Sequence, residues 1–275
     1  MSLGFVLTNY NNSKFTKGAI QSVLDSDSLS SPIIIVDNGS KTEHVEQLQI
    51  LEKMHKSVII IYNEDNVGYF KGLNVGIEFG REKYSDIKYW VVGNNDLVFS
   101  KYIKSEISSC KDVIDEYPVV SPNIVTVNGV QQNPHVIYKI GKFREFIYDI
   151  YHFNYYFAII IKLLASFSSR FTDRNDELQY EIAQEIYQGY GACYILTPVF
   201  FTEFKELWSP TFLMYEEFFL SMQLQEKGYK TFYQPTIKVM HHWHATVGEL
   251  PNHFRWKLCR DAHKEYRKYV KVWRE

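Results

Sequence analysis

The chain has 275 residues, of which 45% are hydrophobic, enough to bury the core of one large α/β domain or two small ones. Its 30 Lys and Arg residues nearly balance 32 Asp and Glu residues, so the net charge of -2 gives no overall field that would attract nucleic acid. Three cysteines without CxxC spacing argue against a disulfide framework and a zinc site, and favour a reducing, cytoplasmic compartment.

Membrane-spanning and leader segments are not expected. The longest apolar stretch, residues 157–167, is about half as long as a membrane span and contains Lys162. The N-terminus leads directly into an apolar segment, without the basic region and cleavage site of a secretory signal.

The first 122 residues alternate apolar, β-rich runs with helical patterns, which is typical of a parallel sheet covered by helices. Strands are expected at residues 3–8, 32–37, 57–62 and 88–93. Helices are expected around residues 15–24 and 42–54. Polar loops follow the four strands at residues 9–12, 37–40, 63–68 and 94–96. Because the carboxyl ends of strands in open α/β sheets face the ligand crevice, we expect these loops to converge on one site.

After residue 122 the pattern changes to turn-rich and then aromatic, helical sequence. We therefore expect a first half at 1–122, a second half at 123–250 with a helical insertion at about 142–187, and a C-terminal helix within 251–275. Within the second half we expect turns and short strands at 123–134, a strand at 189–197, a helix at 216–227 ending at Gly228, and a strand pair near 230–240.

Four glycines, Gly68, Gly72, Gly76 and Gly80, fall at every fourth position and would line one face of a helix. A glycine inside a helix costs about 1 kcal/mol relative to alanine, so another group must approach this backbone closely. That group is either the sheet beneath the helix, or a nucleotide laid across the helix start, where free amides bind phosphate.

Two aspartates directly follow expected strands. Asp37 begins an Asp-Asn-Gly-Ser loop, where it either binds a base or ribose or only forms a turn. Asp96 ends the sequence Asn94-Asn95-Asp96. It is placed to bind a divalent cation together with phosphate oxygens, although a helix cap is the commoner role of such a residue.

Glu216 and Glu217 open an expected helix, on which adjacent residues point about 100° apart. One of them can therefore face a cleft as a general base while the other stabilises the helix N-terminus, and two surface acids are the alternative. Residues 241–244 contain three histidines after an expected strand. Side chains alternate along extended chain, so this tract favours one histidine completing a carboxylate-held metal over a complete zinc site.

In their order and spacing these motifs resemble the inverting family-2 glycosyltransferases of the GT-A fold, and look most like the rhamnosyltransferase-like enzymes of surface polysaccharide assembly. The resemblance covers roughly residues 3–250. It implies a Rossmann-like α/β fold with a mostly parallel central sheet and a helical C-terminal acceptor region. It also implies transfer of a sugar, with inversion, from a UDP- or dTDP-sugar to a hydroxyl of a glycan acceptor.

The resemblance assigns roles to individual residues. The implied donor-binding residues are Thr8, Asn9, Tyr10, Asp37, Asn66, Gly68, Lys71, Gly72, Asn74, Asn94, Asn95 and Gly191. The implied ligands of a Mg or Mn ion are Asp96 and His241. Glu217 is the implied catalytic base, with Glu216 beside it. The chain departs from the family pattern in three places, because Asn94 and Glu217 both stand where an aspartate is usual and Phe219 replaces a further common acid.

Other interpretations stay open. The aromatic and basic segment from Tyr148 to Arg170 is compatible with an acceptor groove, with core packing, or with peripheral contact to the inner membrane face, where a lipid-linked acceptor would lie. A sugar nucleotidyltransferase should carry a Gly- and Arg-bearing loop after its first strand, but residues 9–13 contain neither. A catalytically inactive nucleotide-sugar or glycan-binding module is the other alternative.

Overall fold

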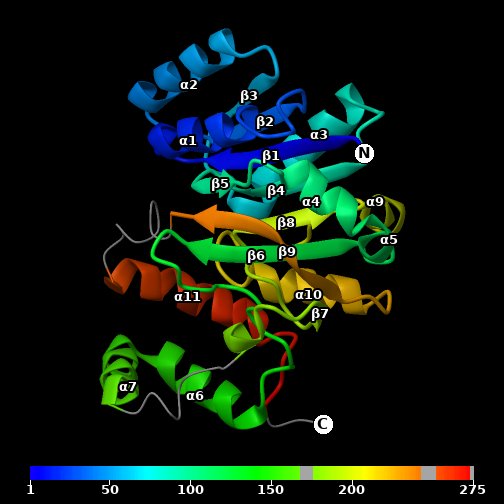
Figure 1. Ribbon diagram of the computed structural model, residues 1–275. Coiled ribbons are helices and arrows are strands. Elements are labelled where there is room, and N and C mark those ends of the chain that lie inside the picture. Colours follow the sequence, from blue (N-terminus) through cyan, green and yellow to red (C-terminus); the bar gives the residue numbers. More distant parts are fainter. Residues whose placement is uncertain (168–175, 243–251, 273–275) are drawn as a thin grey trace.

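One mixed sheet runs through the part of the chain that the computed structural model describes, residues 1–167, 176–242 and 252–272 (Figure 1). Its nine strands are β1 Leu3–Asn9, β2 Ile33–Asn38, β3 Val58–Asn63, β4 Tyr89–Asn94, β5 Leu97–Phe99, β6 Val119–Thr126, β7 Gln184–Ile186, β8 Cys193–Leu196 and β9 Thr231–His241. Their order is β3-β2-β1-β4-β8-β6-β9-β5, and β7 pairs with β9. The expected α/β class is confirmed.

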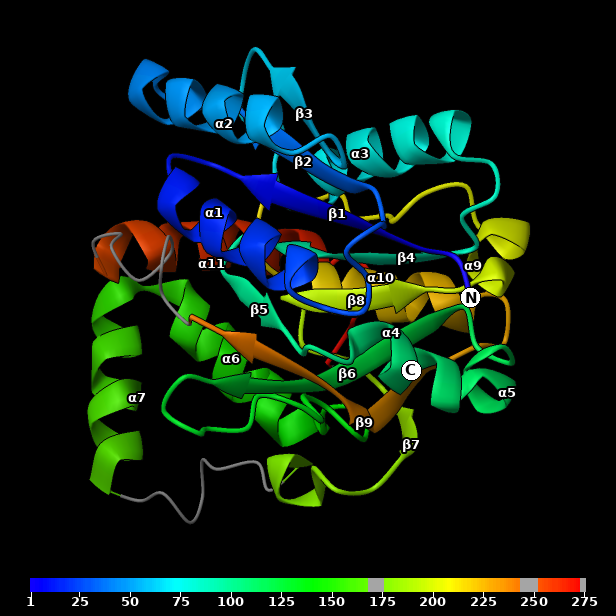
Figure 2. The same ribbon diagram turned by 45° about the horizontal axis from the view of Figure 1, so that its top comes forward.

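Helices cover both faces of this sheet (Figure 2). They are α1 Ser13–Leu24, α2 Thr42–Met54, α3 Tyr69–Lys83, α4 Ile103–Ser109, α5 Lys111–Ile114, α6 Lys142–Phe153, α7 Tyr155–Phe167, α9 Pro198–Glu203, α10 Glu216–Gln225 and α11 Asn252–Tyr266, with a 3-10 turn at Asp176–Gln179. One apolar core packs α1, α2 and α4 against the sheet, and a second packs α3, α9 and α10 against its other face. Both faces of β1 and β2 are therefore buried, which explains their continuous apolar runs.

The first four strands in the sequence, β1 to β4, are parallel to one another, as the alternation of strands and helices predicts. Strand β8 then pairs antiparallel with both β4 and β6, and β9 runs parallel to β6. The two expected halves therefore share one continuous sheet, which is mixed in its second part.

Three elements of the second half differ from the sequence prediction. Strand β6 begins at Val119, ahead of the turns predicted from residue 123. Where the sequence predicts a strand pair, β9 is one bent strand, because its register against β6 shifts between Gln234 and Lys238 and so accommodates Pro235 in a bulge. The predicted helical insertion also contains the short strand β7.

The glycine face of α3 lies directly on the sheet. A Cβ atom at Gly76 would lie 2.4 Å from Cγ1 of Val6, and one at Gly80 would lie 2.4 Å from the Trp90 ring. Of the two explanations for this glycine pattern, close helix-to-sheet packing therefore accounts for these two positions. Gly68 is different, because it precedes the helix and has a φ of 93°.

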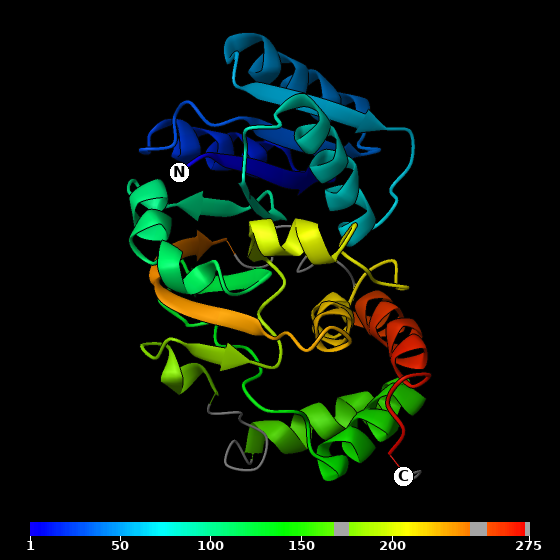
Figure 3. The ribbon, with the colours of Figure 1, turned by 90° about the vertical axis from the view of Figure 1, so that its right-hand side faces the viewer.

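Helices α6, α7 and α11 gather at the end of the molecule opposite α2 (Figures 1 and 3). Helix α7 buries Ala158 but leaves Ile160, Leu163 and Leu164 at least half exposed. Among the described residues, no helix combines the length and apolar character needed to cross a membrane.

Candidate active site

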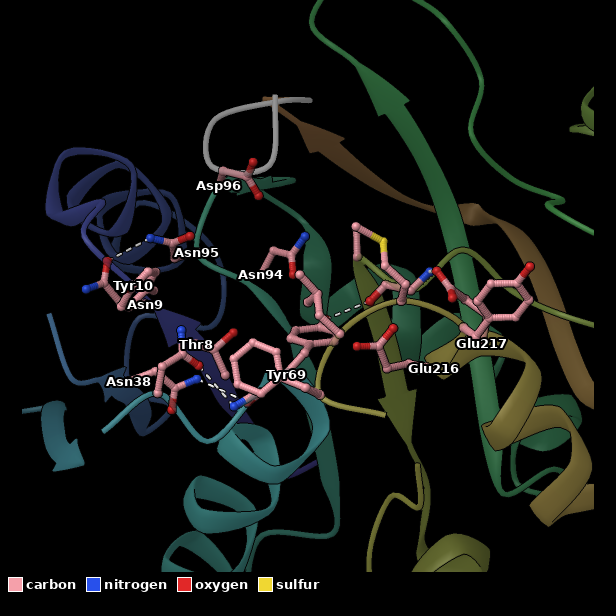
Figure 4. A pocket seen from close by; sticks show the side chains of 18 of the residues that line it. Thr8, Asn9, Tyr10, Asn38, Tyr69, Asn94, Asn95, Asp96, Glu216 and Glu217 are labelled. Atoms are coloured by element: carbon pink, nitrogen blue, oxygen red, sulfur yellow. Dashed lines mark hydrogen bonds between the residues drawn. The ribbon is translucent and has the colours of Figure 1, made fainter. Parts of the chain in front are cut away.

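A pocket of about 290 Å³ opens at the carboxyl ends of β1 and β4. Twelve of the predicted site residues line it: Thr8, Asn9, Tyr10, Asn66, Gly68, Asn94, Asn95, Asp96, Gly191, Glu216, Glu217 and His241. In Figure 4, Thr8, Asn9 and Tyr10 lie on one side of the pocket, while Glu216 and Glu217 lie on the other. The expected convergence of strand-end loops is therefore present, and it includes residues from both halves of the chain.

Buried hydrogen bonds fix the loop after β1. Asn9 Nδ2 donates to Asp37 Oδ1 at 2.6 Å, and Asn95 Nδ2 donates to Asn9 Oδ1 at 2.9 Å. The other carboxylate oxygen of Asp37 accepts from the backbone N–H of Ser40 at 3.0 Å. These hydrogen bonds hold three strand-end loops together. Asp37 supports the pocket wall from behind and does not line the pocket itself.

Asn38 and Gly68 shape the neighbouring wall. Asn38 Nδ2 donates to the carbonyl of Gly68 at 3.1 Å, and Asn38 Oδ1 accepts from Asn63 at 2.9 Å. A Cβ atom at Gly68 would lie 2.3 Å from the Phe212 carbonyl oxygen, so this position needs glycine both for space and for its φ. The segment around Phe212 is thereby brought against the start of α3.

Asp96 and His241 form a pair that suits a cation. Asp96 is 6% exposed, its Oδ1 accepts no hydrogen bond, and it lies 3.2 Å from His241 Nε2. His241 Nδ1 donates to Gln132 Oε1 at 2.7 Å, because that oxygen can only accept. With its proton on Nδ1, the imidazole leaves Nε2 as a ligand atom, so Asp96 and His241 would together hold a divalent cation. No group of three or more His, Cys, Asp and Glu residues able to hold a metal occurs in the described chain.

The two glutamates at the start of α10 differ in environment. Glu217 Oε1 accepts from the backbone N–H of Gly191 at 3.2 Å, and the Gly191 carbonyl accepts from Tyr69 Oη at 2.6 Å. Glu216 is buried with an unpartnered Oε1, and burial together with the charge of Glu217 raises its pKa to about 8. Near neutral pH, Glu216 therefore holds a proton to a large extent.

The turn before these glutamates is strained. Met214 and Tyr215 have φ angles of 76° and 67°, and Asn11 is the remaining non-glycine residue of the described chain with a positive φ. Such residues cost about 1–3 kcal/mol each and persist where surrounding contacts hold them.

Three predicted donor residues lie away from the pocket in addition to Asp37. Gly72 packs under Asn38, where a Cβ atom would lie 2.7 Å from the amide nitrogen. Asn74 bonds both atoms of its amide to the backbone of Leu207, at 2.8 and 3.0 Å, and so anchors the segment that leads to residue 212. Lys71 is exposed on α3. His244 lies outside the described residues.

Nine lining residues are not among those given a role from the sequence: Asn38, Tyr69, Tyr190, Ala192, Phe212, Leu213, Met214, Tyr215 and Arg255. Most of them lie within or beside the predicted motifs, because they adjoin Asp37, Gly68, Gly191 or Glu216 in the sequence. Asn38 stands inside the Asp-Asn-Gly-Ser loop and was within reach of that motif. Arg255 was not, because α11 brings it to the pocket from the far end of the chain, where it is the sole Lys or Arg lining the pocket in the described residues.

The sheet, the strand-end pocket and the acidic pair opposite it define an α/β protein of GT-A type. The model of the family described as "Glycosyl transferase family 2" matches residues 5–165, more than half of the chain. The chain belongs to this family.

Solved structures share the fold at low identity. GalNAc-T7 with UDP, GalNAc and Mn2+ is 13% identical, with a TM-score of 0.56 over 88% of this chain and 44% of that one. TarS 1-349 of S. aureus is 11% identical, with a TM-score of 0.50 over 98% of this chain and 73% of that one. This chain therefore spans less than half the length of GalNAc-T7. A comparison with curated protein sequences gave no match.

Proposed function

We propose that this protein is a glycosyltransferase that moves a sugar from a nucleotide diphosphate donor to a hydroxyl of a glycan acceptor. One observation carries the proposal: the Asp96–His241 pair and the Glu217 carboxylate line the same pocket at the strand ends. Family membership and the GT-A fold support it. The finer features of the proposal rest on the sequence resemblance. They are UDP or dTDP as the nucleotide, inversion, a rhamnosyl-type sugar and a role in surface polysaccharide synthesis.

In this proposal, residues 1–122 bind the donor. Thr8, Tyr10 and Asn66 contact the nucleoside, since they line the pocket on the β1 side. Asn94 and Arg255 face the diphosphate, and the positive charge of Arg255 favours that group. Asp96 and His241 would hold a Mg or Mn ion, which would take up the charge that develops on the leaving diphosphate.

The second half, residues 123–250, then binds the acceptor together with α11. A hollow of about 260 Å³ lies beyond Glu217 and is walled by aromatic rings, among them Tyr148, Phe218 and Tyr266. Glu217 lines both this hollow and the donor pocket, which is where a base between donor and acceptor must lie. Within the described chain, no Lys or Arg lines the hollow, which favours an uncharged sugar ring at the reacting end of the acceptor.

The proposed reaction is a single displacement. Glu217 takes the proton from the acceptor hydroxyl as its oxygen bonds to the anomeric carbon. The bond from that carbon to the diphosphate oxygen breaks on the opposite face, so the configuration inverts. Glu216, largely protonated near neutral pH, can donate a hydrogen bond in the same pocket, because its pKa is raised to about 8.

The test combines binding with turnover. Thermal-shift measurements with UDP-, dTDP- and GDP-sugars, with and without MnCl2, should identify a donor that raises the Tm. Hydrolysis or transfer of that donor is then measured for the wild type, Asp96→Ala and Glu217→Gln. We expect Asp96→Ala to lose the manganese-dependent shift, and Glu217→Gln to keep the shift but lose turnover by about 100-fold or more. Full activity of Glu217→Gln would rule out its role as the base.

The alternatives give different results in the same assay. An inactive binding module would show the thermal shift without turnover in the wild type. A sugar nucleotidyltransferase would release pyrophosphate from a nucleoside triphosphate and a sugar phosphate.

We further propose that the exposed apolar face of α7 contacts a membrane surface from the cytoplasmic side, in keeping with a lipid-linked acceptor.

A further inference from the structure

A chain of partly buried hydrogen bonds begins at the strained turn before the glutamates. Tyr215 Oη lies 2.9 Å from His263 Nδ1, and His263 Nε2 lies 2.9 Å from Asp149 Oδ1. Asp149 also accepts from Arg267 Nε at 2.5 Å. The chain therefore joins the turn to α11 and α6, which are far from it in sequence.

The direction of the protons follows from chemistry. An ionised carboxylate only accepts, so His263 Nε2 must carry the proton that is donated to Asp149. Burial lowers the pKa of His263, against the opposing effect of Asp149, so the ring is neutral at pH 7. Nδ1 of the neutral ring then accepts from the Tyr215 hydroxyl. The donor and the acceptor of each hydrogen bond in this network are therefore defined.

The surroundings hold the histidine firmly. The side chain of His263 is 6% exposed, and the His152 ring stacks on it at 4.2 Å with an interplanar angle of 17°. Arg267 continues the network to Glu145, whose carboxylate lies 2.8 Å from Nη1. Neither His263 nor Asp149 lines the donor pocket or the hollow beyond Glu217.

We propose that His263 and Asp149 are positioning residues, which hold Tyr215 and with it the left-handed turn that aims Glu216 and Glu217 into the pocket. Two features of Tyr215 carry this proposal: its positive φ, and its hydroxyl, which is bonded to the buried His263 and through it to Asp149 and Arg267. The functional part rests on the proposed roles of the two glutamates. The turn itself is held whether or not those roles are right.

Two variants each break the hydrogen-bond network at a different residue. Tyr215→Phe deletes the hydroxyl and keeps the ring, and Asp149→Ala deletes the carboxylate outside the pocket. Tyr233→Phe is the matched control for the first, because Tyr233 is fully buried and its hydroxyl donates to the Tyr180 carbonyl at 2.6 Å. Asp27→Ala is the control for the second, because Asp27 is half-buried and accepts from the Lys104 and Ser105 amides at 2.8 Å.

Hydrogen exchange followed by mass spectrometry measures the turn directly. We expect amides within residues 212–219 to exchange at least about tenfold faster in Tyr215→Phe and Asp149→Ala than in the wild type. The controls should leave that segment unchanged. Unchanged exchange in both variants, or faster exchange spread over the whole chain, would overturn the proposal.

Turnover of the donor tests the functional part. Both variants should lower kcat at least about tenfold while the donor KM stays within about twofold, because the residues proposed to contact the donor are unchanged and the base is misplaced. A rise in KM with normal kcat would contradict positioning of the base. If the wild type turns over no donor, the proposed function fails, and the exchange result still decides whether the network holds the turn.

Discussion

At the residue scale, Gly191 sets the place of the proposed base. Its N–H donates to Glu217 Oε1, and a Cβ atom there would lie 2.6 Å from that oxygen. Since the atom in the way is the end of a flexible side chain, the protein can relieve the contact by moving the carboxylate. A small change at Gly191 should therefore affect chemistry more than folding.

We expect Gly191→Ala to lower kcat about tenfold or more while leaving the Tm within a few degrees of the wild type. Steady-state kinetics with the donor found by thermal shift, and a melting curve, check the two halves of this prediction. Gly141→Ala is the control for a glycine variant, because nothing lies within 4 Å of a Cβ atom there and its φ of -74° suits alanine. Gly191→Ala with normal turnover would show that Glu217 need not lie against the backbone.

Glu216 makes stability depend on pH. Its pKa is about 8 in the folded protein against an ordinary value of 4.5, because of burial and then the charge of Glu217. Between these two pH values the folded chain binds more protons than the unfolded chain, so this residue makes the protein less stable as the pH rises from about 4.5 to 8. Glu216→Gln removes the ionisation.

Glu216→Gln should therefore raise the Tm at pH 8 by more than it does at pH 5. Melting curves at the two pH values test this, with Glu78→Gln on the exposed face of α3 as the control. Equal shifts at both pH values would mean that Glu216 ionises normally in the folded protein.

At the scale of single elements, α1 and α3 show why glycine has opposite consequences in two helices. A Cβ atom at Gly76 of α3 would collide with Val6 and Val36, at 2.4 and 2.8 Å, whereas nothing lies within 4 Å of one at Gly18 of α1. The sequence shows the glycines, but it does not show which helix presses on the sheet.

We expect Gly76→Ala to destabilise the protein by about 1–3 kcal/mol, because overpacking outweighs the gain in helix propensity. Gly18→Ala should stabilise it by about 0.5–1 kcal/mol, because only the propensity changes. Urea unfolding of both variants measures the difference. Destabilisation by both would mean that α1 also packs too closely for a methyl group.

Elements and local motifs were predictable where one stretch of sequence determines them. The first four expected strands match β1 to β4 to within one or two residues, because alternating strands and helices leave a periodic signal. The single bent strand β9 is not predictable from its own sequence, because the bulge that accommodates Pro235 depends on pairing with the distant strand β6. Gln132 and His263 were not predicted for the same reason, since Gln132 lies 109 residues from His241, and His263 lies 48 residues from Tyr215 and 114 from Asp149.

At the scale of the whole molecule, α7 lies at the end of the protein opposite α2 (Figures 1 and 3) and leaves apolar side chains exposed there. Leu163 and Leu164 are 56% and 63% exposed, and Lys162 directly precedes them in the helix. A helix of this composition gains free energy by burying its apolar side chains at a lipid interface, and its lysine is attracted to anionic lipid.

Flotation with phosphatidylglycerol-containing vesicles tests this surface. We expect the wild type to float, and the double variant Leu163→Ser/Leu164→Ser to lose most of that binding. Leu29→Ser is the control, because Leu29 is 62% exposed but lies in the loop after α1, away from α7. A wild type that stays at the bottom of the gradient would remove the membrane proposal without affecting the donor pocket.

The pairing of β4 with β8 limits how the pocket can open. Trp90 to Gly93 are bonded in register to Leu196 to Cys193, so the ladder crosses the boundary between the two halves of the chain. A hinge motion, in which two lobes rotate about a linker, would have to break this ladder. Substrate entry and product exit are therefore left to the segments that border the pocket, and the time for one catalytic cycle would depend on loop movement rather than on rotation of domains.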